Sequence, residues 1–185
     1  MFLGFYAFSA QKVDREYTDY NGLIRLSHNT DKAWSNIDVL LKQRHDEIPK
    51  LVKVCEGYMK HERDTLESVT KARTDCMQSG SVGQSAQNEN MLSQALKSLF
   101  AVAENYPDLK ANQGFMQLQQ RVSYLESQIA DRREFFNESV NNYNIRIHQL
   151  PDMFVANMLA MKDKELFKVL EEDRQDVDIS FDFPK

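Results

Sequence analysis

The sequence predicts an all-α fold: an antiparallel up-and-down bundle of about four long helices with coiled-coil-like packing, a short C-terminal helix and an acidic tail. Only 6 Gly and 4 Pro in 185 residues leave few positions for turns, which favours a few long elements. Apolar residues recur at spacings of three or four along most of the chain, and no stretch of strand length alternates apolar and polar residues. Because each helical stripe must be buried against another, a bundle is the economical arrangement.

The first apolar stripe keeps its phase from Leu23 to Val69 and ends in a predicted loop at residues 78–90, which is rich in Gly and Ser. Inside this stripe, Pro49 leaves two alternatives. Asp46 caps a restarting helix that has Pro49 in its first turn, or a continuous helix is kinked because Pro49 cannot bond to the His45 carbonyl. The unbroken phase favours the continuous helix, whereas bundle topology favours the turn.

Later segments also show apolar residues at spacings of three or four. A stripe over residues 92–103 stops before Pro107, and the most regular stripe runs from Phe115 to Ile147, with Arg132 at a core position. Arg132 should therefore extend to solvent or pair with an acid. The amide-rich stretch Asn141, Asn142 and Asn144 suggests hydrogen bonds across the bundle.

Residues 153–161 form a short apolar segment that contains Phe154, Val155, Met158 and Leu159. We expect a lid over one end of the core in preference to an interfacial contact, because surface apolar clusters of this size are common.

Cys55 and Cys76 lie 21 residues apart. On one helix that separation is roughly 32 Å, far beyond the reach of a disulfide. We expect two free, core-facing thiols in a reducing compartment. The net charge of −5 argues against nucleic acid as a general partner, since phosphate binding needs a basic face.

Motifs for common chemistries are absent from the sequence. The residues three positions before the four histidines include no Glu, which excludes the Glu-x-x-His pairs of di-metal bundles, and His61-Glu62 is followed by Thr65 where a zinc hydrolase needs its second His. His45, Asp46 and Glu47 are consecutive and diverge on a helix. We therefore predict no catalytic residue, no cofactor and no metal site.

The first ten residues, "MFLGFYAFSA", are apolar and aromatic. They lack the basic start of a secretory signal and are shorter than the about 20 residues that span a bilayer. Three alternatives remain: a start that packs on the domain, an interfacial anchor, or the cut end of a membrane helix. Composition alone favours the first.

Five stretches in register resemble the LemA family over about residues 18–170. They are "YNGLIRL" (20–26), "AWSNIDVLLKQRHDEIPKLV" (33–52), "GYMKHERDTLESVTKAR" (57–73), "AENYPDLKAN" (103–112) and "DRREFFNESVNNYNIRIHQLP" (131–151). Members of the family often have a Gly-Phe pair after the last short helix. This chain differs there, because it has "LAMKDKELF" (159–167). The resemblance implies a helical bundle after an N-terminal transmembrane helix of a bacterial membrane protein, and it assigns no catalytic residue.

With this resemblance, we expect residues 1–10 to end a membrane helix, residues 11–161 to form the bundle and residues 162–185 to form an acidic tail. The expected protein is a non-enzymatic, single-pass scaffold of the bacterial inner membrane, with its domain on the cytoplasmic side and an unidentified protein partner. The predicted membrane contacts are Phe2, Leu3, Phe5, Tyr6 and Phe8. The alternatives are a metal-dependent enzyme that uses His45, His61 and acidic neighbours, and a homo-oligomeric structural protein.

Overall fold

The computed structural model describes the backbone of residues 2–168 and the side chains of residues 20–168. Within this range the regular secondary structure is entirely helical: α1 (Phe2–Glu56), α2 (Arg63–Met77), α3 (Val82–Ala103), α4 (Pro107–Lys110), α5 (Gln113–His148) and α6 (Asp152–Met158). The predicted all-α bundle with a short C-terminal helix is confirmed. The predicted acidic tail beyond Lys168 lies outside the described residues.

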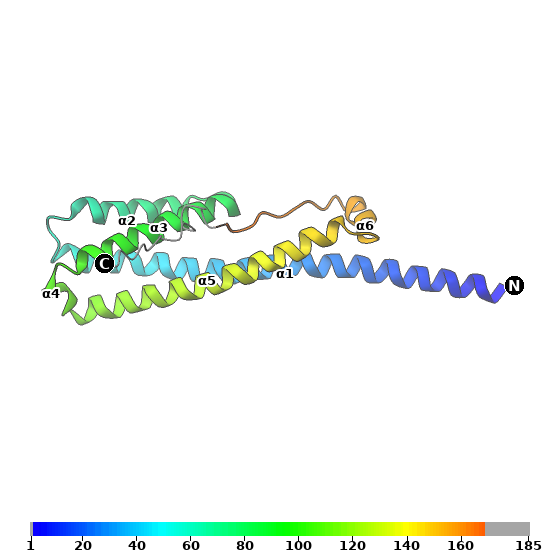
Figure 1. The fold of residues 1–185 in the computed structure, drawn as a ribbon, viewed down its shortest axis with the longest axis horizontal. Helices are drawn as coiled ribbons and strands as arrows, with labels where there is room; N and C mark the ends of the chain where they lie inside the picture. The colour runs from blue at the N-terminus through cyan, green and yellow to red at the C-terminus, as the bar shows by residue number, and fades with distance from the viewer. Residues whose placement is uncertain (1, 169–185) are drawn as a thin grey trace, which may run out of the picture.

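The helices form an elongated antiparallel bundle (Figure 1). Helices α1 and α5 pack along each other over most of α5, and they make the largest helix pair. Helices α2 and α3 form a hairpin that covers the half of this pair nearest α4, whereas α6 lies at the other end. The N-terminal part of α1 extends past α6, beyond the rest of the bundle.

The buried apolar side chains divide into three clusters along the bundle axis. The largest lies where α1, α2, α3, α4 and α5 meet and includes Ile48, Leu51, Cys55, Val69, Leu96, Leu99, Phe115 and Val122. The second contains Ala33, Ile37, Leu41, Ala86, Ile129, Phe136, Val140 and Phe167. The third, under α6, contains Leu23, Tyr143, Ile147 and Ala156. The predicted stripes therefore supply the core, α6 acts as the expected lid, and Cys55 and Cys76 are free and buried as predicted.

Helix α1 passes through Pro49 without a restart, so of the two alternatives at this position the continuous helix is the one observed, and Asp46 is not a helix cap. Because Pro49 has no N–H, the carbonyl of His45 lacks its helical partner. Arg73 of α2 replaces that partner, since its Nε donates to the His45 carbonyl oxygen at 2.7 Å. The proline thus creates an acceptor on α1 to which α2 is joined.

The loop predicted at residues 78–90 is shorter, because α3 already begins at Val82. Ser81 has an extended backbone and its side chain accepts a hydrogen bond from the backbone N–H of Gln84 at 3.2 Å. This N-cap starts the helix despite the Gly and Ser residues that follow.

Arg133, not Arg132, turns toward the core. Arg132 is exposed, whereas the guanidinium carbon of Arg133 lies 4.4 Å from the ring centre of Phe167. Nη2 of Arg133 also donates to Oδ1 of Asn90 at 2.6 Å. Both arginines border the apolar stripe of α5, and Arg133 is the one that meets partners from α3 and the C-terminal segment.

The expected membrane anchor is not found. Across the described part of the chain, no helix combines the length and the hydropathy that a bilayer crossing requires. Within α1, the apolar run of residues 1–10 is followed by Lys12, Asp14, Arg15 and Glu16. The prediction of a single-pass inner-membrane protein held by its N-terminal segment is therefore wrong. The side chains predicted to contact the membrane, Phe2, Leu3, Phe5, Tyr6 and Phe8, lie outside the described side chains.

Candidate functional site

A group of polar side chains gathers where the four long helices meet. Its members come from every one of these helices: Arg44 and His45 from α1, Cys76 from α2, Glu89 and Ser93 from α3, and Glu126 from α5. We call these six residues the polar layer. Arg44 is 1% exposed and Glu89 is 3% exposed, so both charges are removed from water.

Arg44 is the centre of the polar layer. Its Nη2 forms a short ion pair with Oε2 of Glu89, and its Nη1 lies 2.6 Å from Oε1 of Glu126. The same Nη1 donates to Oγ of Ser93 at 3.0 Å, and Ser93 Oγ donates to Glu126 Oε1 at 3.0 Å. One guanidinium therefore connects α1 to both α3 and α5 through charge-assisted hydrogen bonds, which are the strong ones in proteins.

His45 extends the layer toward α2. Its Nε2 lies 2.9 Å from Oε1 of Glu89, a contact that becomes an ion pair when the imidazole is protonated. Burial acts to raise the pKa of Glu89, but the contact with His45 and the charge of Arg44 outweigh it and hold that pKa below its ordinary value. The ionised form of Glu89 is thus favoured by the Arg44 guanidinium and by the contact with His45.

Three residues of the layer offer atoms that suit a metal ion. Donor atoms of His45, Cys76 and Glu89 lie within 4.8 Å of one another, and imidazole, thiolate and carboxylate are ligands of zinc. However, Arg44 already occupies the second oxygen of Glu89. Burial, reinforced by the Glu89 carboxylate, also raises the pKa of the Cys76 thiol to about 12, which favours the neutral thiol. A charge-compensated structural layer fits these contacts better than a cation site does.

The predicted alternative that joined His45 to His61 is not supported by the geometry. His61 is exposed in the turn between α1 and α2, and it does not belong to the group that holds His45.

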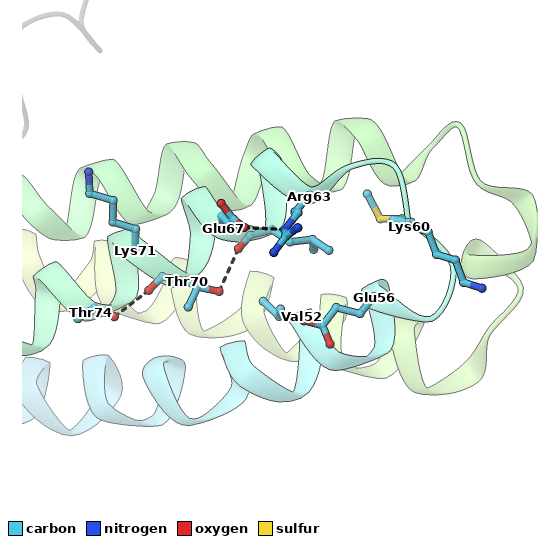
Figure 2. Close-up of a pocket in the computed structure, with 10 residues that line it drawn as sticks. Val52, Glu56, Lys60, Arg63, Glu67, Thr70, Lys71 and Thr74 are labelled. Atoms are coloured by element: carbon cyan, nitrogen blue, oxygen red, sulfur yellow. Dashed lines mark hydrogen bonds and ion pairs between the residues drawn. The ribbon is translucent and has the colours of Figure 1, made fainter.

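A surface cleft between the last turns of α1 and helix α2 is a second candidate (Figure 2). It has a volume of about 670 Å³ and is lined by Val52, Glu56, Met59, Lys60, Arg63, Leu66, Glu67, Thr70, Lys71 and Thr74. Arg63 Nε pairs with Glu67 at 2.9 Å, and the Thr70 hydroxyl donates to the Leu66 carbonyl. The lining includes neither His nor Cys, and the hydroxyls of Thr70 and Thr74 donate to main-chain carbonyls of α2.

Arg44, Glu89 and Glu126 were not recognised from the sequence as members of a site. A signal was present: Arg44 lies between the core residues Leu41 and Ile48, and Glu89 lies between Ala86 and Leu92. A charged residue at a core position of a helical stripe needs a buried partner. The apolar stripes do not show how the helices are aligned along one another, and this alignment is what brings Arg44 and Glu89 together.

Comparison with known proteins identifies the family. The sequence model of the LemA family matches residues 33–181. The chain is 24% identical to the magnetosome protein MamQ 2 of Paramagnetospirillum magneticum over 175 residues, which are 80% of this chain and 64% of that protein. It is 28% identical to protein LemA of Metamycoplasma hominis over 165 residues, 86% of this chain and 74% of that protein. A match to MamQ of Magnetospirillum gryphiswaldense has 22% identity and covers 80% of this chain and 64% of that protein.

The chain therefore spans less than two thirds of the length of the MamQ proteins that it matches. The family model covers most of the sequence, and its limits include the polar layer, the last part of α1 and all of α2, α3 and α5. The chain belongs to the LemA family.

Proposed function

We propose that this chain is a non-catalytic helical scaffold that acts through protein contacts. The polar layer supports this proposal, because Arg44 pairs with both of its carboxylates and the raised pKa of the Cys76 thiol favours the neutral form. The names of the relatives refer to the magnetosome or to the family, and none of these names refers to a reaction.

The observation that carries the proposal is an apolar ridge at the α6 end of the bundle. Leu150, Phe154 and Met158 are 69%, 67% and 75% exposed, the highest values among the large apolar residues that the structure describes. Phe154 and Met158 are four residues apart on α6 and so lie on one side of it, whereas Asp152 and Ala156 are buried; Leu150 lies in the turn just before α6. We call these three residues the α6 ridge.

The α6 ridge suits the apolar groove between two helices of a partner protein. On α6, Phe154 and Met158 are about 6 Å apart along the axis at 1.5 Å per residue, which is the i, i+4 spacing of anchors on a helix seated in such a groove. Phenylalanine and methionine are enriched at protein interfaces, where they act as anchors that fill pockets. Helix α6 is itself fixed on the core by Ala156, so the ridge is held in place before any partner binds.

The test compares the native size of the chain in extracts of its source cell with that of two variants. Phe154→Ser/Met158→Ser removes the ridge, and Met77→Ser removes a side chain that is 62% exposed at the end of α2. We expect the wild-type chain and Met77→Ser to migrate as the same large complex and the ridge variant to migrate as a free chain. A wild-type chain that migrates as a free chain would contradict the proposal.

Sedimentation of the purified protein separates two kinds of partner. A purified wild-type monomer indicates that the partner is a different protein. The opposite result is a purified wild-type chain that forms the large species by itself, while the purified ridge variant does not. That result would show a homo-oligomer and would contradict the existence of a separate partner protein.

A further inference from the structure

The eight residues that follow α6 and its turn, Met161–Lys168, lie in a groove between α1 and α5. We call this segment the strap. It has no regular secondary structure and runs along the bundle from α6 toward α3 (Figure 1). Phe167 of the strap is 0% exposed and belongs to the second core cluster.

Two asparagines of α5 hold the main chain of the strap. The Asn144 side chain donates from Nδ2 to the Lys164 carbonyl at 2.9 Å and accepts at Oδ1 from the Lys164 N–H at 2.9 Å. Asn137 makes the same pair with Phe167, at 3.0 Å to its carbonyl and 2.8 Å from its N–H. Each amide therefore satisfies both polar groups of one residue, as a neighbouring strand would.

The spacing of the two amides matches the repeat of an extended chain. Asn137 and Asn144 lie seven residues apart on α5, or about 10.5 Å along a helix. Lys164 and Phe167 lie three residues apart, or about 10 Å along an extended segment. The surface of α5 is thus in register with an extended peptide. Since the amides contact main-chain atoms alone, this part of the site does not depend on the side chains of the peptide.

A pocket for an aromatic side chain lies at one end of the groove. The Phe167 ring centre is 5.6 Å from that of Trp34 on α1, and Trp34 in turn packs on Phe136 of α5 at 5.5 Å. Arg133 covers the other part of the ring at 4.4 Å, a cation–π contact. Apart from Phe167 itself, the walls of this pocket are residues of the bundle.

A pocket for a lysine lies at the other end. Nζ of Lys164 is 2.6 Å from Oδ1 of Asp31 and donates to the Thr30 hydroxyl and to the Ser27 carbonyl, the latter at 3.2 Å. The Tyr143 ring centre lies 5.2 Å away. Thr30 is buried, so the acceptors of α1 form a fixed receptor for an ammonium group.

We propose that this groove is a binding site for extended segments of a partner protein that carry a lysine followed, three residues later, by phenylalanine, and that the strap occupies the site in cis. The bundle supplies the two amides, the ammonium receptor and the aromatic walls, and the strap supplies only the ligand groups. A free segment must compete with the tethered strap, whose effective concentration is of the order of millimolar for a short linker. A partner segment therefore binds only if its affinity and concentration are high enough to displace the strap.

The test uses a fluorescent peptide of residues 161–168, MKDKELFK, and the full chain. Lys164→Ser/Phe167→Ser removes both anchors of the strap and opens the groove. We expect this variant to bind the peptide at least tenfold more tightly than the wild-type chain does. Adding Asn137→Ala/Asn144→Ala to the opened chain should abolish binding, and a peptide with Ser in place of its Phe should bind at least tenfold more weakly.

A folded, opened chain that does not bind the peptide would overturn the proposal, and so would equal binding of the two peptides. Helicity and thermal unfolding show whether the opened chain is folded. If it is not, Lys164→Ser alone keeps the core phenylalanine, and this variant must still bind the peptide more tightly than the wild-type chain. A wild-type dimer that dissociates in the opened chain would show that the occupant is a second copy and would refute a partner segment.

Discussion

Replacing Arg44 with Met tests whether the polar layer depends on a buried ion pair. The Glu89 side chain is 4% exposed, and Arg44 is its closest cation. Removing one partner of a buried pair leaves an uncompensated charge and costs about 3–5 kcal/mol. For a domain of this size each kcal/mol lowers the melting temperature by about 2–4 °C, so Arg44→Met should melt roughly 6–20 °C below the wild-type chain.

The double variant Arg44→Met/Glu89→Leu separates the stranded charge from lost packing. Replacing both members of a buried pair by apolar residues is often neutral or stabilising, so the double variant should recover most of the free energy of unfolding that Arg44→Met loses. The assay is urea unfolding followed by circular dichroism. The control is Arg63→Met, which breaks the exposed Arg63–Glu67 pair and should cost less than about 1 kcal/mol.

Two results would refute the ion-pair reasoning. One is a loss below about 1 kcal/mol for Arg44→Met, which would place Glu89 in contact with water. The other is a double variant whose loss equals the sum of the two single losses, because coupled residues in one network must deviate from additivity.

Three further outcomes follow from the contacts described. Arg73→Met should lower the free energy of unfolding by about 1–3 kcal/mol in urea unfolding. The loss should be clearly smaller in a Pro49→Ala background, because an alanine at position 49 restores an N–H donor to the His45 carbonyl. Equal losses in the two backgrounds would contradict this account. The pKa of Glu89 lies below its ordinary value of 4.5, so its ionised form stabilises the fold above that pH and the stabilisation is lost as the pH falls through the folded pKa. The stability difference between the wild-type chain and Glu89→Gln should therefore shrink in acid, and a constant difference between pH 7 and pH 3 would be inconsistent with this linkage. Burial raises the pKa of the Cys55 thiol to about 11 and that of Cys76 to about 12, so a thiol reagent at pH 8 should label both only as the chain unfolds; rapid labelling of the folded chain would show that the thiols are accessible.

The sequence predicted what depends on local periodicity. The stripes from Leu23 to Val69 and from Phe115 to Ile147 became the buried faces of α1, α2 and α5, because apolar spacing of three or four identifies the face of a helix that must be covered. The boundary of α3 was placed too late, since the Gly and Ser composition of residues 78–90 outweighed the N-cap of Ser81 in that prediction.

What could not be predicted depends on register between distant helices. Arg44 and Glu126 are 82 residues apart in the sequence, and only the packing of α1 on α5 shows that they pair. The amide-rich stretch was expected to hydrogen-bond across the bundle. Asn144 does make such bonds, but its partner is the strap, and Asn137 was not recognised. The first residues of the predicted acidic tail, which include Lys164 and Phe167, lie against the bundle because these two pockets accept their side chains.

The most direct test of the scaffold proposal is a photo-crosslinking scan in the source cell. A photoreactive amino acid is placed at Leu150, Phe154 or Met158 of the α6 ridge, and at the exposed controls Val39 and Met77. If the chain acts through this ridge, the three ridge positions should give one shared crosslinked product of defined mass and the controls should not give it. Products that are the same at ridge and control positions, or that are absent at all three ridge positions, would contradict the proposed function.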